Sequence, residues 1–323
     1  MARRIGVDLG GTKILIALAE ENGNIAQSIK IPTRAGRGPE VILKDLFAGF
    51  ADYFSISLEK MEGIGFCMAG YYDRQEGTIR GSPNLPGWEN YPVMQQLQRF
   101  SNLPVVVEND ANAAAWGEFV YGAGQGKKNL LLVTLGTGIG GALIVDGKLA
   151  HGARGFAGEI GHIPILPREG PLCGCGNRGC LETLASGRAV EREGRGLLKR
   201  GIPTLLQEMV DETTLRAIDV FEAARQGDQR SREIIDQAAF YLGQGLAAAV
   251  NMFNPEIVII GGGMAGVGEL FFAPLRRYFS QMALGPSAQT VSLVGAKLGE
   301  AAGVQGILAL LNDFLPARKE KLC

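Results

Sequence analysis

The sequence lacks an excess of either charge. Its 323 residues include 32 lysines and arginines against 33 aspartates and glutamates, which gives a net charge of −1. Nucleic acids and anionic membranes attract proteins through a surplus of basic residues, and none is present here. We therefore expect neither nucleic acid nor a membrane among the partners of this protein.

Long apolar runs are also missing. No 18 consecutive residues are free of polar side chains, and a membrane-spanning helix needs about that length. The first residues, MARRIGVDLGG, contain no apolar core of a signal peptide. These absences predict a cytoplasmic protein, long enough for two domains. In a reducing cytosol, a group of cysteines favours metal binding over disulfides.

Histidine and cysteine are scarce, yet several of them lie close together. Of two histidines and five cysteines, one histidine and three cysteines fall in residues 161–182, GHIPILPREGPLCGCGNRGCLE. A C-x-C disulfide would be strained, and the C-x-x-C of redox proteins is absent. Three thiolates and an imidazole suit Zn²⁺, and four protein ligands leave no open position for chemistry. The predicted ligands of this structural zinc are His162, Cys173, Cys175 and Cys180. His151 and Cys323 are predicted to be surface residues.

Two segments of the chain resemble each other. Residues 4–25 and 129–149 both contain two β-type apolar stretches around a Gly/Thr-rich turn, followed by an Asn-Gly or Asp-Gly turn. Their spacing of about 125 residues is too long for a solenoid repeat. Residues 231–253 have helical spacing, and Pro255 marks the end of that helix. The pattern predicts a duplicated α/β domain.

Three glycine-rich loops follow predicted strands. Residues 10–13, GGTK, lack the upstream glycine of a Walker A loop. Residues 136–141 and 261–266 both fit G-x-G-x-x-G, the fingerprint of dinucleotide binding. The first loop leads into a predicted strand, where the fingerprint needs a helix, and the second lacks the acidic residue expected about 20 residues later for the ribose. Neither loop therefore favours dinucleotide binding. Turns of this kind can direct backbone N–H groups at phosphates. Asp8, at the end of the first strand, is suited to hold Mg²⁺ through water.

The motifs, in their order, resemble those of one family. DLGGTK, ENDANAAAWGE, TLGTGIGG, GEIGH, C-x-C-G-x-x-G-C-x-E and IVIIGGG are similar to the motifs of ROK sugar kinases and repressors. The resemblance implies an α/β fold of the actin-like ATPase (ribonuclease H-like) type, with two duplicated lobes and a cleft between them. We expect a smaller lobe at 1–118, joined by 300–323, and a larger lobe with the zinc loop at 119–299.

The resemblance also implies roles for single residues. Asp110 is implied as the general base that takes the proton of the sugar's primary hydroxyl. A carboxylate at a helix N-terminus stays ionised, although Asp110 by itself would also suit a helix N-cap. The implied sugar-binding residues are Asn84, Asn109, Asp110, Glu159, His162 and Glu182. The implied nucleotide-binding residues are Asp8, Gly10, Gly11, Thr12, Lys13, Thr137, Gly138, Gly262 and Gly263. We further predict that His162 binds zinc through one ring nitrogen and donates from the other to a sugar hydroxyl.

The implied activity is ATP-dependent phosphorylation of glucose to glucose 6-phosphate. ATP, Mg²⁺ and one structural Zn²⁺ are the expected cofactors, and a homodimer or homotetramer is the expected assembly. Kinases of fructose, N-acetylmannosamine or N-acetylglucosamine are alternatives, because CMAGYYD at 67–73 departs from the Pro-Gly and Val-Asp pattern of many relatives. A sugar-sensing regulator is less favoured, since the repressors carry an N-terminal helix-turn-helix and the first phosphate strand here begins by residue 4.

Overall fold

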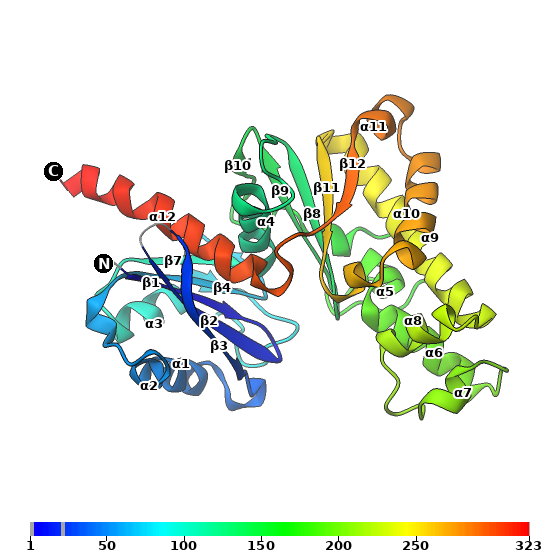
Figure 1. Cartoon of the computed structure of the whole chain (residues 1–323), viewed down its shortest axis with the longest axis horizontal. Coiled ribbons are helices and arrows are strands. Elements are labelled where there is room, and N and C mark those ends of the chain that lie inside the picture. Colours follow the sequence, from blue (N-terminus) through cyan, green and yellow to red (C-terminus); the bar gives the residue numbers. More distant parts are fainter. Residues whose placement is uncertain (1–2, 21–22, 323) are drawn as a thin grey trace.

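The computed structural model describes residues 3–20 and 23–322, so the predicted surface thiol Cys323 lies outside the described residues. For Glu59 and residues 316–322 it describes the backbone alone. Within this range the chain forms two five-stranded mixed sheets in two lobes (Figure 1). The first sheet has the order β3 (Ile25–Pro32), β2 (Lys13–Glu20), β1 (Arg3–Leu9), β4 (Met61–Met68) and β7 (Val105–Asn109). The second has the order β10 (Lys148–Leu149), β9 (Ile139–Val145), β8 (Leu130–Leu135), β11 (Ile257–Gly261) and β12 (Ser292–Gly295).

The two sheets repeat one topology. In the first, β1 pairs antiparallel with β2 and parallel with β4, and β4 pairs parallel with β7. In the second, β8 pairs antiparallel with β9 and parallel with β11, and β11 pairs parallel with β12. The predicted duplicated α/β fold is therefore confirmed, and the similar segments 4–25 and 129–149 contain the matching strand pairs β1–β2 and β8–β9 of the two sheets.

Burial follows position in the sheet. β1 and β8 are almost wholly buried because helices cover both faces of a central strand. β3 is an edge strand, and it exposes Gln27, Ser28 and Lys30 to solvent. The exposure of β3 and the runs of buried residues in β1 and β8 are thus consequences of edge and centre positions.

The first lobe has its own core on one side of its sheet. Its elements besides the sheet are η1 (Ala35–Arg37), α1 (Pro39–Ala48), α2 (Phe50–Phe54), η2 (Leu58–Lys60), β5 (Tyr72–Asp73), β6 (Thr78–Ile79) and α3 (Val93–Phe100). Phe50, Phe66 and Trp88 are fully buried at its centre. β5 and β6 form a small hairpin, and Tyr72 and Ile79 anchor that hairpin in the same core.

The second lobe carries most of the helices. They are η3 (Ile160–His162), α5 (Leu181–Ala185), α6 (Gly187–Lys199), α7 (Leu206–Met209), α8 (Ala217–Arg225), α9 (Gln229–Phe253), η4 (Gly263–Val267), α10 (Glu269–Met282) and α11 (Gly285–Thr290). The helix predicted at 231–253 is confirmed as α9. Asp228 caps its N-terminus by accepting from Ser231 N, and Asn254 ends it in a left-handed conformation just before Pro255. None of the helices in the described part of the chain is long and apolar enough to cross a membrane.

Two helices cross between the lobes. α4 (Asp110–Tyr121) continues from the first sheet and packs on β8 and β9, whereas α12 (Ala302–Leu322) follows the second sheet and η5 (Gly299–Ala301) and packs on β1 and β4 (Figure 1). α4 and α12 touch at Gly306, where a Cβ would lie 1.6 Å from the carbonyl oxygen of Ala113. The predicted lobe boundary at 118/119 falls within α4, and the exact division into domains stays a prediction.

Candidate active site between the lobes

A cavity of about 280 Å³ is lined by both lobes. It brings together most of the residues that the resemblance implied, although they come from widely separated parts of the sequence. The implied residues on its walls are Gly10, Gly11, Asn84, Asn109, Asp110, Thr137, Gly138, Glu159, His162, Glu182 and Gly262. Thr12, Lys13, Asp8 and Gly263 are not among its lining residues. The substrate-side prediction thus corresponds to one physical pocket.

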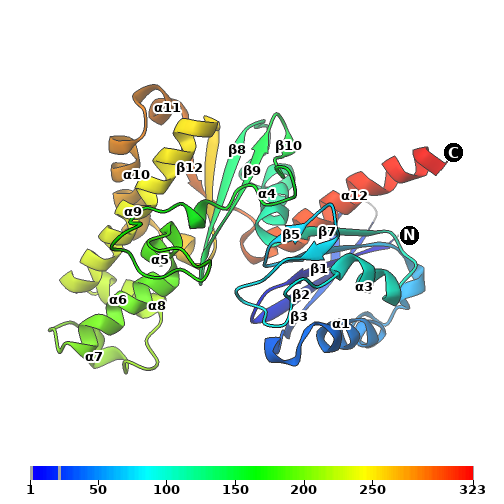
Figure 2. The same ribbon diagram turned by 180° about the vertical axis from the view of Figure 1, so that it is seen from behind.

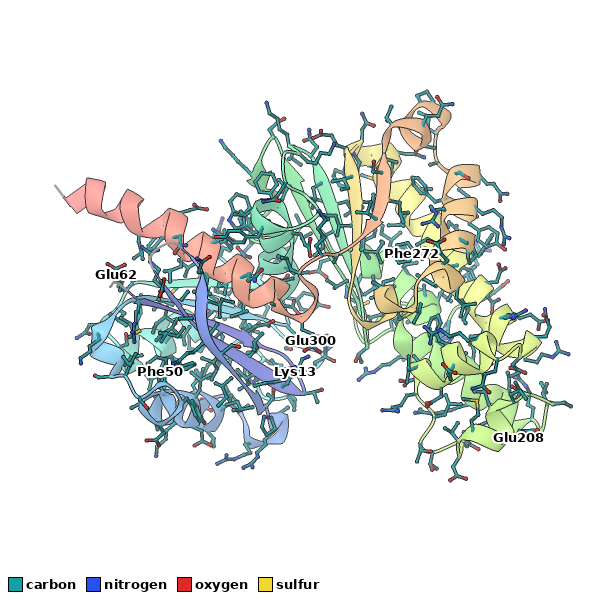
Figure 3. All side chains as sticks on the ribbon, viewed as in Figure 1. Lys13, Phe50, Glu62, Glu208, Phe272 and Glu300 are labelled. Atoms are coloured by element: carbon teal, nitrogen blue, oxygen red, sulfur yellow. The ribbon has the colours of Figure 1, made fainter. Side chains whose placement is uncertain are left out.

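The first glycine turn joins β1 to β2. Gly10 N donates to Lys13 O at 3.0 Å, and the hydroxyl of Thr33 donates to Gly10 O at 2.6 Å, so the turn is fixed from two sides. The Lys13 side chain does not line the cavity and pairs with Glu300 Oε1 at 2.6 Å, and both residues are labelled in Figure 3. The turn backbone, rather than the Lys13 side chain, faces the pocket in this conformation.

The second glycine turn joins β8 to β9 on the opposite wall. Gly136 N donates to Gly138 O at 3.0 Å, and Ile139 N donates to Glu182 Oε2 at 2.9 Å. A Cβ at Gly138 would lie 2.1 Å from that same carboxylate oxygen. A glycine is therefore required at 138 for Glu182 to reach the turn, which ties a predicted sugar-binding residue to a predicted phosphate-binding one.

A second cavity, of about 420 Å³, continues from the first. Both are lined by Gly136 and Thr137, and Gly263 lies in this second cavity. Its other walls come from α6, α8 and η4 and include Gly187, Arg188, Glu191, Arg216, Ala217, Phe221 and Met264. Sequence reasoning missed these residues, because most of them lie in a polar, helix-forming region without a recognisable motif, and Met264 lies in the glycine-rich loop 261–266 without an assigned role.

Asp110 lies at the junction of β7 and α4. The N-cap of α4 is Asn109, whose Oδ1 accepts from Ala111 N at 2.8 Å and from Asn112 N at 3.1 Å. The interpretation of Asp110 as the cap is therefore wrong, and its carboxylate lies in the first turn, where it accepts from Ala111 N at 2.9 Å. Asn109 Nδ2 donates to Gly70 O at 3.1 Å, which fixes the junction against the loop after β4.

Burial controls the acidity of these carboxyl groups. It raises the pKa of Asp110, although the backbone N–H groups around it and the Asn109 side chain lower it. The backbone N–H groups at the helix N-terminus, which favour the ionised form, are thus the weaker influence on the pKa of Asp110. Burial, with the charges of Asp110 and Glu182, raises the pKa of Glu159 to about 7. Shifts of this kind are typical of functional sites.

Asp8 lies beneath the cavity rather than on its wall. In the β1–β4 register it is opposite Cys67, which is fully buried, and a Cβ at Gly303 would lie 2.5 Å from its Oδ2. Burial and the charge of Asp110 raise the pKa of Asp8 to about 7, against the opposing effects of a Cys67 hydrogen bond and the charge of Lys13. Cys67 is a neighbour of the site that sequence reasoning left unassigned.

The four predicted zinc ligands converge. Their ligand atoms all lie within 4.8 Å of one another. Cys175 Sγ lies 3.7 Å from Cys180 Sγ, and Cys173 Sγ lies 3.6 Å from His162 Nδ1. Zinc bonds of about 2.3 Å in a tetrahedron require ligands roughly 3.7 Å apart, so the set fits Zn²⁺. A disulfide needs sulfurs at about 2.05 Å, and this distance therefore excludes one between Cys175 and Cys180 here.

His162 connects this set to the cavity. Its Nδ1 faces the cysteines, while its Nε2 lies 3.0 Å from the hydroxyl of Tyr71. Tyr71 belongs to the divergent CMAGYYD segment and also lines the cavity. The second nitrogen of His162 thus faces the hydroxyl of Tyr71 at the cavity wall, and its predicted bond to a sugar stays a prediction.

His151 is not the plain surface residue that we predicted. Its side chain is 23% exposed, and its Nε2 lies 2.8 Å from Oε2 of the buried Glu108. Arg74 Nη1 donates to the same oxygen at 2.5 Å. These three residues lie directly behind the Asn109–Asp110 junction, and only the position of Glu108 next to that junction could have indicated them.

Two lobes built on one repeated sheet, each presenting a glycine turn to a shared cavity, define the actin-like ATPase fold. The family model that the sequence matches is described as the ROK family, over residues 4–313. The chain belongs to the ROK family.

Individual relatives agree with this assignment. The chain is 38% identical to a glucokinase of Halalkalibacterium halodurans over 94% of this chain and 92% of that protein. It is 36% identical to a xylose repressor of Caldicellulosiruptor bescii over 96% of this chain and 78% of that protein. The structure is also similar to a crystal structure of a ROK family glucokinase from Streptomyces griseus in complex with glucose and AMPPNP, with a TM-score of 0.83. The two sequences are 37% identical, and the match covers 96% of this chain and 99% of that one.

Proposed function

We propose that this protein transfers the γ-phosphoryl group of ATP to the 6-hydroxyl of glucose. The observation that carries the proposal is the position of Asp110, in one cavity with two glycine turns and with the polar side chains of Asn84, Glu159 and Glu182. The similarity to glucokinases, one of them solved with glucose and AMPPNP, supports glucose as the sugar and ATP as the donor.

The two cavities suit the two substrates. The larger one, about 420 Å³, accommodates the adenosine of ATP, and the smaller one, about 280 Å³, accommodates a hexose. Because both include Gly136 and Thr137, a triphosphate that starts in the larger cavity reaches the glycine turns and ends near Asp110. Backbone N–H groups of such turns bind phosphate oxygens without side-chain charge.

Asp110 acts as the general base in this proposal. The 6-hydroxyl oxygen forms a bond to the γ-phosphorus, the bond from that phosphorus to the oxygen of ADP breaks, and the hydroxyl proton moves to the Asp110 carboxylate. A base with a raised pKa holds that proton better than an ordinary aspartate does. Asp8 would hold the hydration shell of a magnesium ion bound with ATP, and that ion would neutralise phosphate charge.

The sugar hydroxyls need fixed partners. Glu159 and Glu182 provide carboxylate oxygens, and Asn84 provides an amide. Asn109 uses its oxygen as a helix cap, so it has only Nδ2 to offer a sugar. His162, Cys173, Cys175 and Cys180 hold a zinc ion that keeps the loop before α5 in place. Asn84, Glu159 and Glu182 would then surround the sugar. Zinc takes no part in the chemistry, because its four protein ligands close the coordination sphere.

A substrate panel tests this function. Purified protein with ATP and Mg²⁺ is given glucose, fructose, mannose, N-acetylmannosamine or N-acetylglucosamine, and ADP release is followed by a coupled assay. We expect the highest kcat/KM with glucose. A preference for an acetamido sugar or fructose would change the substrate. Glucose binding by calorimetry without ADP release from any sugar would favour a sugar-sensing regulator. The cytoplasmic location and the homodimer or homotetramer stay predictions.

A further inference from the structure

The β5–β6 hairpin of the first lobe touches the segment 151–155 of the second lobe, and we call this the inter-lobe contact. Figure 2 shows β5 next to α4, on the side of the first lobe that faces the second. Arg74 N donates to Arg154 O at 3.0 Å, and Gln75 Nε2 donates to Ala153 O at 3.1 Å. The hairpin thus bonds across the lobes through both backbone and side-chain groups.

Charged groups reinforce the inter-lobe contact. The side chain of Asp73 is completely buried, and it accepts from Arg80 Nη2 at 3.0 Å and from Arg154 Nη2. Arg154 also pairs with Glu76. A buried carboxylate that loses its partners is costly, so Asp73 holds Arg154, and with it the second lobe, in one position.

Glu108 joins the inter-lobe contact to the Asn109–Asp110 junction. Its side chain is 2% exposed, and its two oxygens face different neighbours. Oε2 accepts from Arg74 Nη1 at 2.5 Å and lies 2.8 Å from His151 Nε2, which donates to it in the Nε2–H tautomer, and Arg74 Nη1 also lies 2.9 Å from that nitrogen. Oε1 accepts from Asn109 N and from Asn112 Nδ2, both at 3.0 Å. One carboxylate therefore binds the hairpin, the second lobe and the first turn of α4 at once.

The partners of Glu108 require a charged acceptor. Burial alone would raise the pKa of Glu108, but the hydrogen bond and charge of His151, the charge of Arg74 and the Asn112 amide bring it below its ordinary value. An uncharged glutamine can still accept from Asn109 N through its oxygen. Its amide group would then face the donors Arg74 and His151, and the bond across the lobes would be lost.

We propose that Glu108 is a positioning residue, which aligns the Asn109–Asp110 junction according to the position of segment 151–155. When the inter-lobe contact is made, His151 and Arg74 hold Glu108, and Glu108 holds the turn that carries Asp110. The position of segment 151–155 and the alignment of the base are then linked through one carboxylate. This inference rests on the proposed role of Asp110 as the base.

The test uses variants on both sides of the contact. We compare Glu108→Gln and His151→Ala, the double variant, and His151→Gln, which restores a side-chain N–H donor at the position of Nε2. Glu118→Gln is the matched control, because Glu118 is another fully buried glutamate, in α4, that accepts from Ala123 N and Leu298 N, both at 2.7 Å. For each protein we measure kcat, the KM values of glucose and ATP, and the thermal midpoint.

We expect Glu108→Gln and His151→Ala each to lower kcat about tenfold, with the KM of ATP changed less than about twofold. The double variant should lose no more than the stronger single one, because both remove the same bond. His151→Gln should recover most of kcat. Glu118→Gln should lower the thermal midpoint and leave kcat near that of the wild type.

Three outcomes would overturn the inference. They are an unchanged kcat in His151→Ala, additive losses in the double variant, or an equal loss of kcat in Glu118→Gln. If Glu108→Gln does not fold, His151→Ala and His151→Gln still test the inference, because His151 is partly exposed and its substitution should leave the protein folded. Asp110→Asn separates this inference from the proposed function. If Asp110→Asn is active, the base assignment fails, whereas an inactive Asp110→Asn beside a fully active His151→Ala refutes the inference alone.

Discussion

The two lobes share one sheet topology but differ where the last strand meets the next helix. In the first lobe, β7 runs directly into α4, and Asn109 and Asp110 lie side by side at the cavity. In the second, residues 296–301 separate β12 from α12, and Glu300 in that stretch pairs with Lys13 and Lys30. The repeat therefore presents a glycine turn from each lobe, but only one junction places a carboxylate in the cavity.

The segments between the third and fourth strands of the two sheets differ in length. Residues 33–60 lie between β3 and β4, whereas residues 150–256 lie between the matching strands β10 and β11. The longer insertion provides Glu159, Glu182, the zinc set and part of the second cavity. The duplicated frame thus sets the positions of the two glycine turns, and the longer insertion adds the carboxylates of Glu159 and Glu182 to the cavity between them.

The largest effect should come from the junction that is unique to the first lobe. We expect Asp110→Asn to lower kcat by about 10² to 10⁴, because the 6-hydroxyl loses its proton acceptor, while glucose still binds. The coupled ADP assay gives kcat, and calorimetry gives glucose affinity. Lys297→Gln, in the linker after β12, is the control and should keep kcat within about twofold. An Asp110→Asn protein with a kcat within about threefold of the wild type would remove Asp110 from the mechanism.

Part of this asymmetry could be predicted from the sequence, and part could not. The glycine turns and the zinc ligands are local in sequence, so spacing and residue type were enough to indicate them. Glu108, His151 and Arg74 meet only because the lobes face each other, and a partly buried histidine at 151 has the same sequence pattern as an exposed one. The direction of the Asp110 pKa depends on burial, which a helix N-terminal position does not reveal.

A substitution at the crossing of α4 and α12 tests how much their close contact contributes to the stability of the protein. We expect Gly306→Val to destabilise the protein by roughly 3 kcal/mol or more, because a side chain there overlaps the Ala113 carbonyl and pushes the helices apart. Gly196→Ala is a matched helix glycine in α6, where an added Cβ would meet only the end of the Arg200 side chain, and it should stabilise by about 0.5–1 kcal/mol. Urea unfolding measures both. Equal stability of the two variants would show that the crossing is loosely packed.

The carboxyl group of Asp8, which has no ionisable equivalent at the matching position of the second lobe, should make the stability of the protein depend on pH. Asp8 precedes the first turn, and Thr134, which cannot ionise, takes the matching place before the second. With a folded pKa of about 7, Asp8 keeps its proton between about pH 4 and 7 while the unfolded chain loses it. The unfolded state then binds fewer protons, so stability falls as pH rises through this window.

Asp8→Asn removes this contribution. Without nucleotide or magnesium, we expect the variant to exceed the wild type in free energy of unfolding by roughly 1–4 kcal/mol at pH 8 and to match it near pH 4. Urea titrations at several pH values measure the difference. A constant gap between the two proteins from pH 4 to 8 would mean that Asp8 is ionised in both the folded and the unfolded chain.

The smallest effect concerns the zinc set, which has no counterpart among the described residues of the first lobe. His162→Cys separates the two contacts of this histidine, since a fourth thiolate keeps a tetrahedral set while the ring nitrogen near Tyr71 and the cavity is lost. We expect about one zinc per chain by elemental analysis and a loss of roughly 1–3 kcal/mol in glucose binding, with little change in ATP affinity.

Cys175→Ala provides the contrast to His162→Cys. It removes a metal ligand whose side chain is exposed and does not line the cavity, so it should lose zinc, stability and glucose affinity together. Thermal unfolding and calorimetry on the two variants separate orientation of the sugar by His162 from support of the loop by zinc. If His162→Cys keeps zinc and an unchanged glucose affinity, the imidazole acts only as a ligand. Its Nε2 would then serve Tyr71 and not the sugar, and Tyr71 would become the residue through which the longer insertion of the second lobe influences the substrate.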